Sequence, residues 1–361
     1  MRTQRLSRWL VASAAVALVA CGGAASNATN PTPQADVGSG QLQGAGATFP
    51  SPYYDKAFYT YNQKYSQVSV NYQPIGSGGG IQQFTKGTVD FGASDVPMTD
   101  AEIQAAGGPD ALVQLPTIIG VESIAYNLSS VDKLQLDGPT LANIDLGTIK
   151  KWNDPAIQAL NSGVKLPGQD ITVVHRSDGS GTTFAFTDYL GKVSPDWQSK
   201  VGKGKSVSWP AGVGASGNQG VGQQVKTTDG AIGYVELAFV IQSKLQQAYL
   251  KNKAGTYVQG TLDGATAAAS TLAGLSPTNF SITNADAAKA YPISSYSWVI
   301  LRRDQTDATK AKAVVNLFKW VVTDGQSLGK DLDYAALPSD SQKFALSQLK
   351  KVTSGGKPVL S

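Results

Sequence analysis

The chain has 361 residues, of which 41% are hydrophobic, 16% are charged and only one is cysteine. Its 30 lysines and arginines face 26 acids, and no basic stripe or polybasic run stands out, so neither a nucleic acid nor a lipid surface is expected as an electrostatic partner. The single cysteine excludes an internal disulfide and a cysteine-rich metal site.

Residues 1–21 have the pattern of an export signal. Three arginines precede an apolar run at residues 9–20, which is too short to cross a bilayer, since that takes about 20 apolar residues. The run leads directly into Cys21, a pattern typical of a bacterial lipoprotein signal in which this cysteine is acylated and becomes the new N-terminus. We therefore expect an extracytoplasmic protein, in the periplasm or on the outer cell surface, held to an envelope membrane by lipid on Cys21. The alternative is an ordinary signal peptide that contains a cysteine.

Residues 22–41 predict a flexible tether. They are mostly Gly, Ala, Ser, Asn, Thr, Pro and Gln with one charge, and such a stretch buries too little apolar surface to offset the entropy of ordering it. Without residues 1–20, which hold three arginines and no acid, 27 basic residues face 26 acidic ones. The remaining 320 or so residues are enough for two domains.

Strand and helix patterns alternate along the rest of the chain. Residues 68–72 alternate like a half-buried strand, and residues 171–174 form a buried one. Apolar and aromatic side chains recur at helical spacing in two segments, and Thr99 with Glu102 predicts a capping box. Those two helical sets are Tyr54, Phe58, Tyr61 and Tyr65, and Val314, Leu317, Phe318 and Val321, the second ending near Gly325. This alternation predicts an α/β fold with largely parallel sheets.

Two long apolar segments indicate strands that connect two lobes. Residues 112–128 are one, and residues 298–301 are the candidate for the return crossing. The sequence therefore predicts that lobe I comprises residues 42–126 and 292–361, with lobe II inserted as residues 127–291. Two lobes joined by two strands would form a hinged cleft.

Three glycine-rich loops each precede a predicted helix. They lie at residues 44–50, 76–80 and 177–183, the last two directly after predicted strands. The first N–H groups of a helix have no intrahelical partner, and glycine lets an oxyanion approach them closely. Each loop alone is more often structural, but three in one chain favour an anion site.

Arg176 stands beside the third loop, and the chain after residue 20 has only two other arginines. A guanidinium matches the paired oxygens of an oxyanion, although a surface ion pair with Asp178 is the alternative. The only histidine is His175, which weighs against a Ser-His-Asp triad and against a zinc site.

Asp95 is a carboxylate that would suit only a protonated anion. Both common forms of phosphate at neutral pH carry an O–H that this side chain can accept, whereas sulfate carries none. A site built around a ligand hydroxyl rejects the analogue without it by roughly 10⁴–10⁵. Taken alone, Asp95 is better explained as a turn or cap residue.

Four ordered motifs resemble those of the phosphate-binding subunit of bacterial phosphate-specific ABC importers. They are residues 44–50 (GAGATFP), 89–95 (VDFGASD), 178–182 (DGSGT) and 230–236 (GAIGYVE). The similarity runs from about Gln43 to the C-terminus. It implies a two-lobed α/β periplasmic-binding-protein fold of type II, with two mixed sheets flanked by helices and a hinged ligand cleft. It also implies a monomer that binds inorganic phosphate, needs no cofactor or metal, and delivers phosphate to permease subunits driven by a cytoplasmic ATPase.

The resemblance also implies the ligand contacts. Two residues, His175 and Gly78, depart from the arginine and serine of related sequences, but neither is a primary contact position. The implied contacts are Thr48, Phe49 through its backbone N–H, Ser77, Asp95 as the proton acceptor, Arg176, Ser180, Gly181 and Thr182, with Asp178 positioning Arg176.

Three other functions remain as alternatives. One is a phosphatase or phosphoryl-transfer enzyme, but the chain lacks both a phosphate-loop motif and a nucleophile elbow. Its one Gly-x-Gly-x-x-Gly match, at residues 212–217, follows Trp209-Pro210 rather than a clear strand. A binder of sulfate or molybdate would gain nothing from Asp95. A surface adhesin would leave the three glycine-rich loops without a role.

Overall fold

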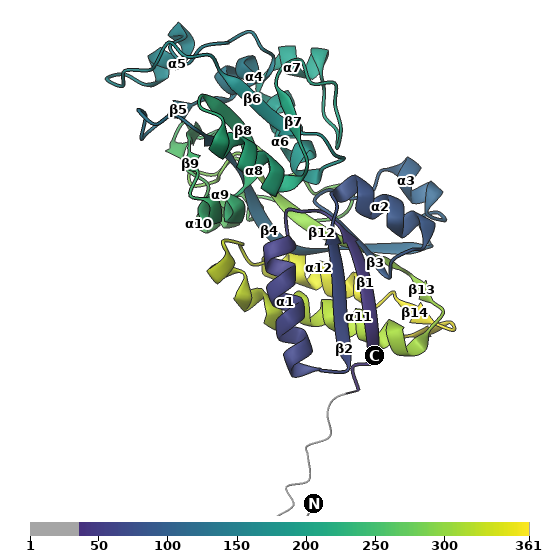
Figure 1. The fold of residues 1–361 in the computed structure, drawn as a ribbon. Helices are drawn as coiled ribbons and strands as arrows, with labels where there is room; N and C mark the ends of the chain where they lie inside the picture. The colour runs from purple at the N-terminus through teal and green to yellow at the C-terminus, as the bar shows by residue number, and fades with distance from the viewer. Residues whose placement is uncertain (1–35, 361) are drawn as a thin grey trace, which may run out of the picture. The chain divides into compact units, whose positions relative to one another are not determined.

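Two mixed β-sheets share one long strand, and helices flank both sheets (Figure 1). The computed structural model describes residues 36–360, and residues from Val37 onward belong to one compact unit. The strand order is β2-β1-β3-β12-β4-β8-β6-β7. Their bounds are β1 (Gly40–Gly46), β2 (Val68–Pro74), β3 (Phe91–Ser94), β4 (Leu112–Tyr126), β6 (Thr172–Arg176), β7 (Val213–Ala215), β8 (Ala231–Glu236) and β12 (Ser294–Arg302).

β4 is the shared strand, and all fifteen of its residues are buried. Its pairing with β12 ends at Val121, and its pairing with β8 begins at Glu122. We call the β1, β2, β3 and β12 side of this point lobe I and the β6, β7 and β8 side lobe II. The predicted mixed two-lobed fold is confirmed, while the predicted limits of the two lobes stay a prediction. Residues 298–301 lie inside the sheet of lobe I, paired with β3 and β4, so the expectation that they form the return crossing is wrong.

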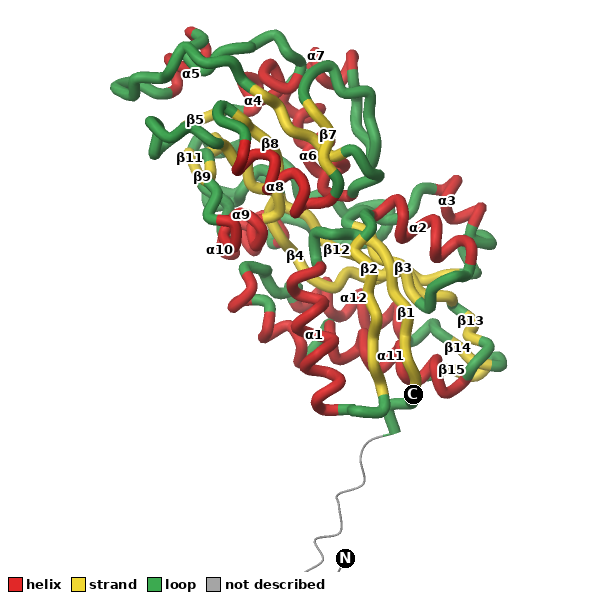
Figure 2. Tube along the Cα trace, in the orientation of Figure 1, coloured by secondary structure: helices red, strands yellow, loops and turns green. Residues whose placement is uncertain are grey.

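Parallel pairing sets which strand ends meet. β1 pairs in parallel with β2 and β3, and β6 pairs in parallel with β7 and β8, whereas β12 runs antiparallel to β3 and β4. The carboxyl ends of parallel strands lie at one edge of a sheet, where ligands bind in open α/β folds. In Figure 2 the loops at these strand ends gather between the two lobes.

The helices cover the faces of the sheets. In lobe I, α1 contacts β2, α11 contacts β1 and α2 contacts β1 and β3; in lobe II, α8 contacts β6 and β8. The helices are α1 (Ser51–Lys64), α2 (Ser77–Lys86), α3 (Asp100–Ala105), α4 (Gly138–Asp145), α5 (Pro155–Leu160), α6 (Gly181–Val193), α7 (Pro195–Lys200), α8 (Gly217–Thr227), α9 (Leu237–Ser243), α10 (Leu262–Ala269), α11 (Ala308–Val321) and α12 (Ser339–Leu349), with 3₁₀ turns η1 (Asp324–Leu328) and η2 (Lys330–Leu332).

Shorter strands complete the structure. β9 (Gln246–Gln247) pairs with β4, and two small three-stranded sheets lie apart from the main pair. These sheets are β5 (Gln135–Leu136), β10 (Tyr249–Lys251) and β11 (Tyr257–Val258), and β13 (Asp304–Gln305), β14 (Thr353–Ser354) and β15 (Lys357–Pro358).

Several local predictions are confirmed. Tyr54, Phe58 and Tyr61 lie on the buried face of α1, while Tyr65 follows the helix as its partly buried C-cap. Phe91 packs edge-on against Phe318 of α11 with ring centroids 4.9 Å apart. Thr99 and Glu102 form the predicted capping box at α3. The helix expected to end near Gly325 ends at Val321 and gives way to the 3₁₀ turn η1.

The predicted tether, residues 22–41, extends too far into the folded body. Val37 is buried, and Gly40 already pairs with Val68 as the first residue of β1. Backbone pairing with β2 orders Gly40 and Gln41 although these two residues bury little side-chain surface. The predicted lipid attachment at Cys21 lies outside the described residues.

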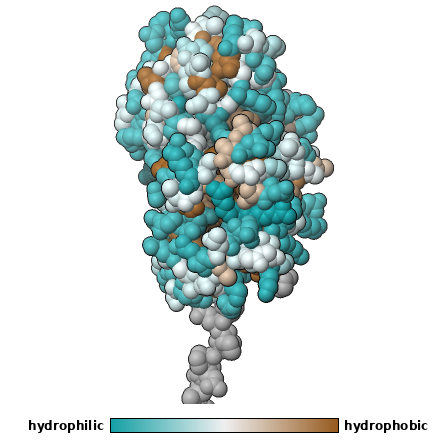
Figure 3. All heavy atoms as spheres, turned by 90° about the vertical axis from the view of Figure 1, so that its right-hand side faces the viewer, coloured by the Kyte–Doolittle hydropathy of each residue, from teal (hydrophilic) through white to brown (hydrophobic). Residues whose placement is uncertain are grey.

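The face of the molecule in Figure 3 is largely hydrophilic, with apolar residues gathered mainly at the top of the view. Large aromatic side chains such as Trp152, Trp197 and Trp298 are fully buried. Among residues 36–360, no helix has both the length and the apolar character that a bilayer crossing requires.

Candidate anion site between the lobes

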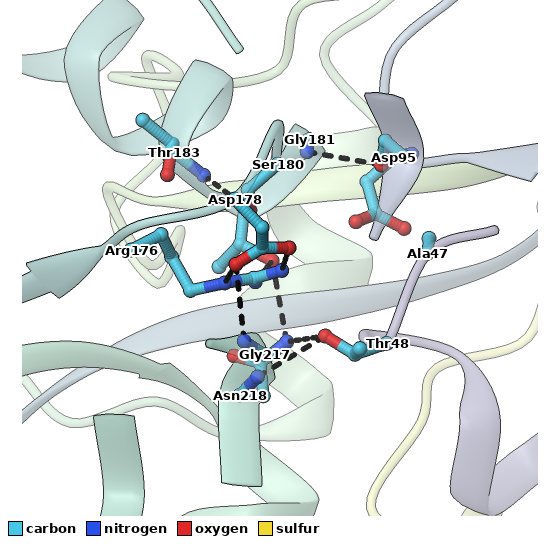
Figure 4. Close-up of polar contacts among 12 residues, drawn as sticks. Ala47, Thr48, Asp95, Arg176, Asp178, Ser180, Gly181, Thr183, Gly217 and Asn218 are labelled. Carbon is cyan, nitrogen blue, oxygen red and sulfur yellow. Dashed lines mark hydrogen bonds and ion pairs between the residues drawn. The ribbon is translucent and has the colours of Figure 1, made fainter. Parts of the chain in front are cut away.

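The predicted site residues meet where the parallel strands of both sheets end. Thr48 and Phe49 follow β1, Ser77 follows β2 and Asp95 follows β3, all in lobe I. On the lobe II side, Arg176 is the last residue of β6, and the loop after it leads to the first turn of α6. Figure 4 shows Thr48 and Asp95 facing Arg176 and Ser180 around one central space. The structure thus brings together residues that are up to 134 positions apart, from Thr48 to Thr182.

Burial of this site is nearly complete. The exposed fractions of the polar side chains are all 3% or less. Buried polar groups need hydrogen-bond partners, because an unsatisfied one costs about 1–3 kcal/mol. These side chains are Thr48, Ser77, Asp95, Arg176, Ser180 and Thr182.

Hydrogen bonds between the lobes close the site. The backbone N–H of Gly181 donates to Ser77 Oγ at 3.0 Å, and the N–H of Gly78 donates to the carbonyl of Gly179 at 2.8 Å. A Cβ at position 181 would lie 2.5 Å from Cβ of Asp95, so only glycine lets the first turn of α6 approach this closely. The second and third glycine-rich loops therefore contact each other across the two lobes.

Arg176 is held by Asp178 inside the site. Its Nε donates to Asp178 Oδ1 at 2.7 Å and its Nη2 to Oδ2 at 2.5 Å, while Nη1 reaches Thr182 Oγ1 at 3.4 Å. The predicted ion pair with Asp178 exists, but Arg176 has only 1% of its side chain exposed, so the surface alternative is wrong. Burial alone would raise the pKa of Asp178, but the hydrogen bonds and charge of Arg176 outweigh it and hold this pKa below its ordinary value.

Asp95 is the carboxyl group that faces these donors. Ser297 Oγ donates to its Oδ1 at 2.9 Å, and its own backbone N–H donates to Ser77 Oγ at 3.2 Å. Burial raises the pKa of Asp95 to about 7, against the lowering effects of Ser297, of the Arg176 charge and of Ser77. Near neutral pH this carboxyl group can therefore accept a proton or a hydrogen bond from a ligand.

Backbone N–H groups at helix starts surround the same space. α2 begins at Ser77 and α6 at Gly181, with Ser180 as its N-cap, whose Oγ accepts from the N–H of Thr183 at 3.1 Å. A third helix, α8, begins at Gly217, whose N–H donates to Asp178 Oδ1 at 3.0 Å. The positive ends of these three helices favour an anion at the site.

Sequence reasoning missed two residues of this site. Asn218, in the first turn of α8, is fully buried and donates to Thr48 Oγ1 from its backbone N–H and from Nδ2, both at 3.1 Å. The nearest sequence signal was the motif at residues 212–217, which contains the short strand β7 and ends at the first residue of α8. Ser297 was missed because it lies within the buried strand β12, where only its polarity marks it.

Such a polar site enclosed between two α/β lobes defines the class of bilobal binding proteins. The family model described as "PBP superfamily domain" matches residues 31–324. A solved structure of a putative phosphate ABC transporter substrate-binding protein with bound phosphate from Clostridium perfringens superimposes with a TM-score of 0.62. That likeness covers 83% of this chain and all of the other at 17% identity, so it speaks for the fold alone.

Two relatives of known family show which family within this superfamily the chain resembles. The chain is 43% identical over 321 residues to the phosphate-binding protein PstS of Xylella fastidiosa (strain 9a5c), covering 88% of this chain and 87% of the relative. It is 45% identical over 303 residues to the protein of the same name from Pasteurella multocida (strain Pm70), covering 83% and 87%. The chain therefore belongs to the PBP superfamily and, within it, to the family of PstS phosphate-binding proteins.

Proposed function

We propose that this protein captures inorganic phosphate between its two lobes and delivers it to the permease of an ABC importer. The single observation that carries the proposal is that one buried carboxyl group, Asp95, stands among groups that can only donate hydrogen bonds. A ligand that suits this arrangement accepts many hydrogen bonds and donates at least one. Inorganic phosphate does both at neutral pH.

The hydroxyl groups of the site are fixed as donors. A hydroxyl has two acceptor lone pairs and one hydrogen. Thr48 Oγ1 accepts two N–H bonds from Asn218, and Ser77 Oγ accepts from the N–H groups of Asp95 and Gly181. Thr182 Oγ1 accepts from Arg176 and Asn218. Each of these hydroxyls therefore has only its O–H left to offer to a ligand.

The charges of the site do not by themselves explain anion binding. Arg176 is paired with Asp178, and Asp95 adds a further acid, so the side chains named here bring no excess positive charge. Binding instead rests on oriented N–H and O–H groups and on helix N-termini, which need no reorganisation when the anion enters. We propose that Thr48, the backbone N–H of Phe49, Ser77, Arg176, Ser180, Gly181 and Thr182 donate to phosphate and that Asp95 accepts from it.

Sulfate and molybdate fit this site less well. A fully ionised dianion offers Asp95 no hydrogen, so the ligand and the carboxylate would face each other as two acceptors. Leaving a buried polar group unpaired costs more than a hydrogen bond gains. The same carboxyl group that binds phosphate therefore excludes sulfate.

An enzymatic role has less support. His175 stacks on Trp209 with ring centroids 4.6 Å apart, and its Nδ1 lies 3.0 Å from the carbonyl of Arg176, so the ring is engaged beside β6. Among residues 36–360, no three His, Cys, Asp or Glu side chains gather as a metal site would require. The relatives named above are called binding proteins. We propose capture without chemistry.

We further propose that the protein is an extracytoplasmic monomer, anchored by lipid on Cys21 and carried on a tether that starts at residue 22. Support comes from the sequence pattern of residues 1–21. We propose that lobe II is inserted as residues 127–291, since β4 changes sheets at Val121 and Glu122, close to the first of these two limits.

Calorimetry tests the proposed function. The chain from residue 22, freed of ligand by partial unfolding and refolding, is titrated with phosphate alone and then in the presence of excess sulfate. We expect one phosphate per chain and no effect of sulfate. No phosphate binding, equal competition by sulfate, or turnover of a phosphate monoester by the same sample would overturn the proposal.

A further inference from the structure

Asn218 has hydrogen bonds to both lobes through its backbone N–H and its side-chain amide. Its Oδ1 accepts from the backbone N–H of Glu236 at 3.0 Å, and its Nδ2 donates to Thr182 Oγ1 at 3.3 Å, both within lobe II. Its backbone N–H and its Nδ2 also donate to Thr48 Oγ1, which lies in lobe I. In Figure 4 the Asn218 side chain points from α8 toward Thr48.

The bonds within lobe II hold Asn218 in place whether or not the lobes are closed. Glu236 is the last residue of β8, and the neighbouring residue Gly217 is fixed by its N–H bond to Asp178. The two bonds to Thr48, in contrast, exist only while lobe I lies against lobe II. Asn218 is therefore a prepositioned donor that waits for Thr48.

We infer that Asn218 is a positioning residue that makes phosphate capture depend on lobe closure. The inference rests on the proposed phosphate function. When the lobes close, Asn218 fills both lone pairs of Thr48, which leaves the Thr48 O–H directed away from Asn218 and toward the anion. When the lobes open, both lone pairs of Thr48 Oγ1 can again accept hydrogen bonds, so the direction of its O–H is no longer fixed.

This arrangement predicts which rate constant Asn218 controls. Encounter with phosphate precedes closure, so the association step does not yet involve the Asn218 bonds to Thr48. Dissociation requires those bonds to break. Removing Asn218 should thus shorten the lifetime of the closed complex and leave the association rate nearly unchanged.

The first test is Asn218→Ala, with phosphate binding followed by stopped flow and calorimetry. We expect phosphate affinity to fall about 10- to 100-fold, the range for buried hydrogen-bonding groups that lose their partner, through faster dissociation. The matched control is Asn127→Ala, because Asn127 Nδ2 donates to the carbonyls of Lys226 and Thr228 within lobe II and does not reach the site. An affinity unchanged by Asn218→Ala, or lost through a slower association, would overturn the inference.

A double-mutant cycle separates positioning from mere stability. If Asn218 acts through the Thr48 hydroxyl, then Asn218→Ala should weaken phosphate binding far less in a Thr48→Val background than in the parent chain. Equal effects in both backgrounds would show that Asn218 only supports the fold.

A second measurement needs no variant and stays decisive even if Asn218→Ala does not fold. Amide hydrogen exchange of the parent chain is followed by NMR with and without phosphate. The Asn218 N–H bonds across the lobes and the Gly217 N–H bonds within lobe II, so phosphate should slow exchange at Asn218 and leave Gly217 nearly unchanged. Equal responses of the two amides would overturn the inference. A parent chain that binds no phosphate in calorimetry would instead refute the proposed function.

Discussion

Carboxyl groups are buried in two regions of the molecule, and their pKa values differ between these regions. In the anion site, Asp95 receives a hydrogen bond from Ser297 and lies near the Arg176 charge, so its pKa rises only to about 7. We call the point where β4 passes from lobe I to lobe II the hinge. There, Glu122 of β4 and Glu236 of β8 form a directly opposed cross-strand pair, and both are fully buried. Burial raises the pKa of both glutamates well above the ordinary value, and nearby carboxyl groups raise it further.

The partners of each group account for the difference. Glu122 Oε1 accepts from Ser295 Oγ at 2.6 Å, and Glu236 Oε2 accepts from the N–H of Ala238 at 2.9 Å, but neither pKa gains support from a cation. Burial therefore favours the protonated form of Glu122 and Glu236, whereas Asp95 can be a carboxylate near neutral pH. Burial and hydrogen-bond donors are common to both regions, since the Tyr334 hydroxyl also donates to Glu236, whereas a nearby cation, Arg176, is present only at Asp95.

Removing the cation from the site should have the largest effect. We expect Arg176→Ala to weaken phosphate binding about 100- to 1,000-fold, that is by about 3–4 kcal/mol, since phosphate loses a buried charged donor and Asp178 is left unpaired. Calorimetry measures the loss, and the melting temperature shows whether the variant is folded. Arg303→Ala is the control, because Arg303 forms an exposed pair with Asp110 and should leave phosphate affinity unchanged. Affinity that survives Arg176→Ala would remove this residue from the site.

Removing one hydrogen-bond donor from Asp95 should favour its protonated form, as burial does for Glu122 and Glu236. In Ser297→Ala the carboxylate loses a hydrogen bond, so the pKa of Asp95 rises above its present value of about 7 and less carboxylate is present at pH 7. We expect phosphate affinity to fall about 10-fold at pH 7 and to recover in part at pH 8.5. Ser295→Ala, two residues along β12, removes the donor to Glu122 instead and should leave phosphate affinity unchanged. Equal effects of the two serines would refute the distinction between the regions.

The hinge acids should lower stability at high pH. Their folded-state pKa lies above the unfolded value of about 4.3, so the folded chain binds more protons than the unfolded chain, and the free energy of unfolding decreases as pH rises above about 4. Each acid contributes a slope of at most about 1.4 kcal/mol per pH unit until the pH passes its raised pKa. We expect Glu236→Gln to raise the melting temperature at pH 8 and to flatten its pH dependence. Asp110→Asn, at an exposed position, is the control, and a parallel pH dependence in Glu236→Gln would contradict this assignment.

The parts of the site that the sequence predicted are those with local patterns. A strand, a glycine-rich turn and a helix start are read from consecutive residues, and this pattern located Thr48, Ser77, Ser180 and Gly181. Parallel pairing then brought these loops to one edge of each sheet, which the alternation of strands and helices also indicated. That these residues contact phosphate stays a prediction.

The residues that escaped prediction depend on long-range pairing. Ser297 reaches Asp95 because β12 pairs with β3, and Asn218 reaches Thr48 because α8 starts where the two lobes touch. The Ser297 contact leaves no local pattern in the sequence, and the glycine motif before Asn218 does not identify Thr48 as its partner. The opposition of Glu122 and Glu236 likewise follows only from the register of β4 and β8, which are more than a hundred residues apart.

The most direct test of the central claim is phosphate-against-sulfate competition in Asp95→Asn, measured by calorimetry beside the parent chain. The amide has nearly the same shape, but it adds N–H donors and cannot carry a negative charge. We predict that the parent chain binds phosphate regardless of sulfate and that Asp95→Asn binds phosphate more weakly and lets sulfate compete. A variant that still ignores sulfate would contradict the claim that Asp95 selects a protonated anion.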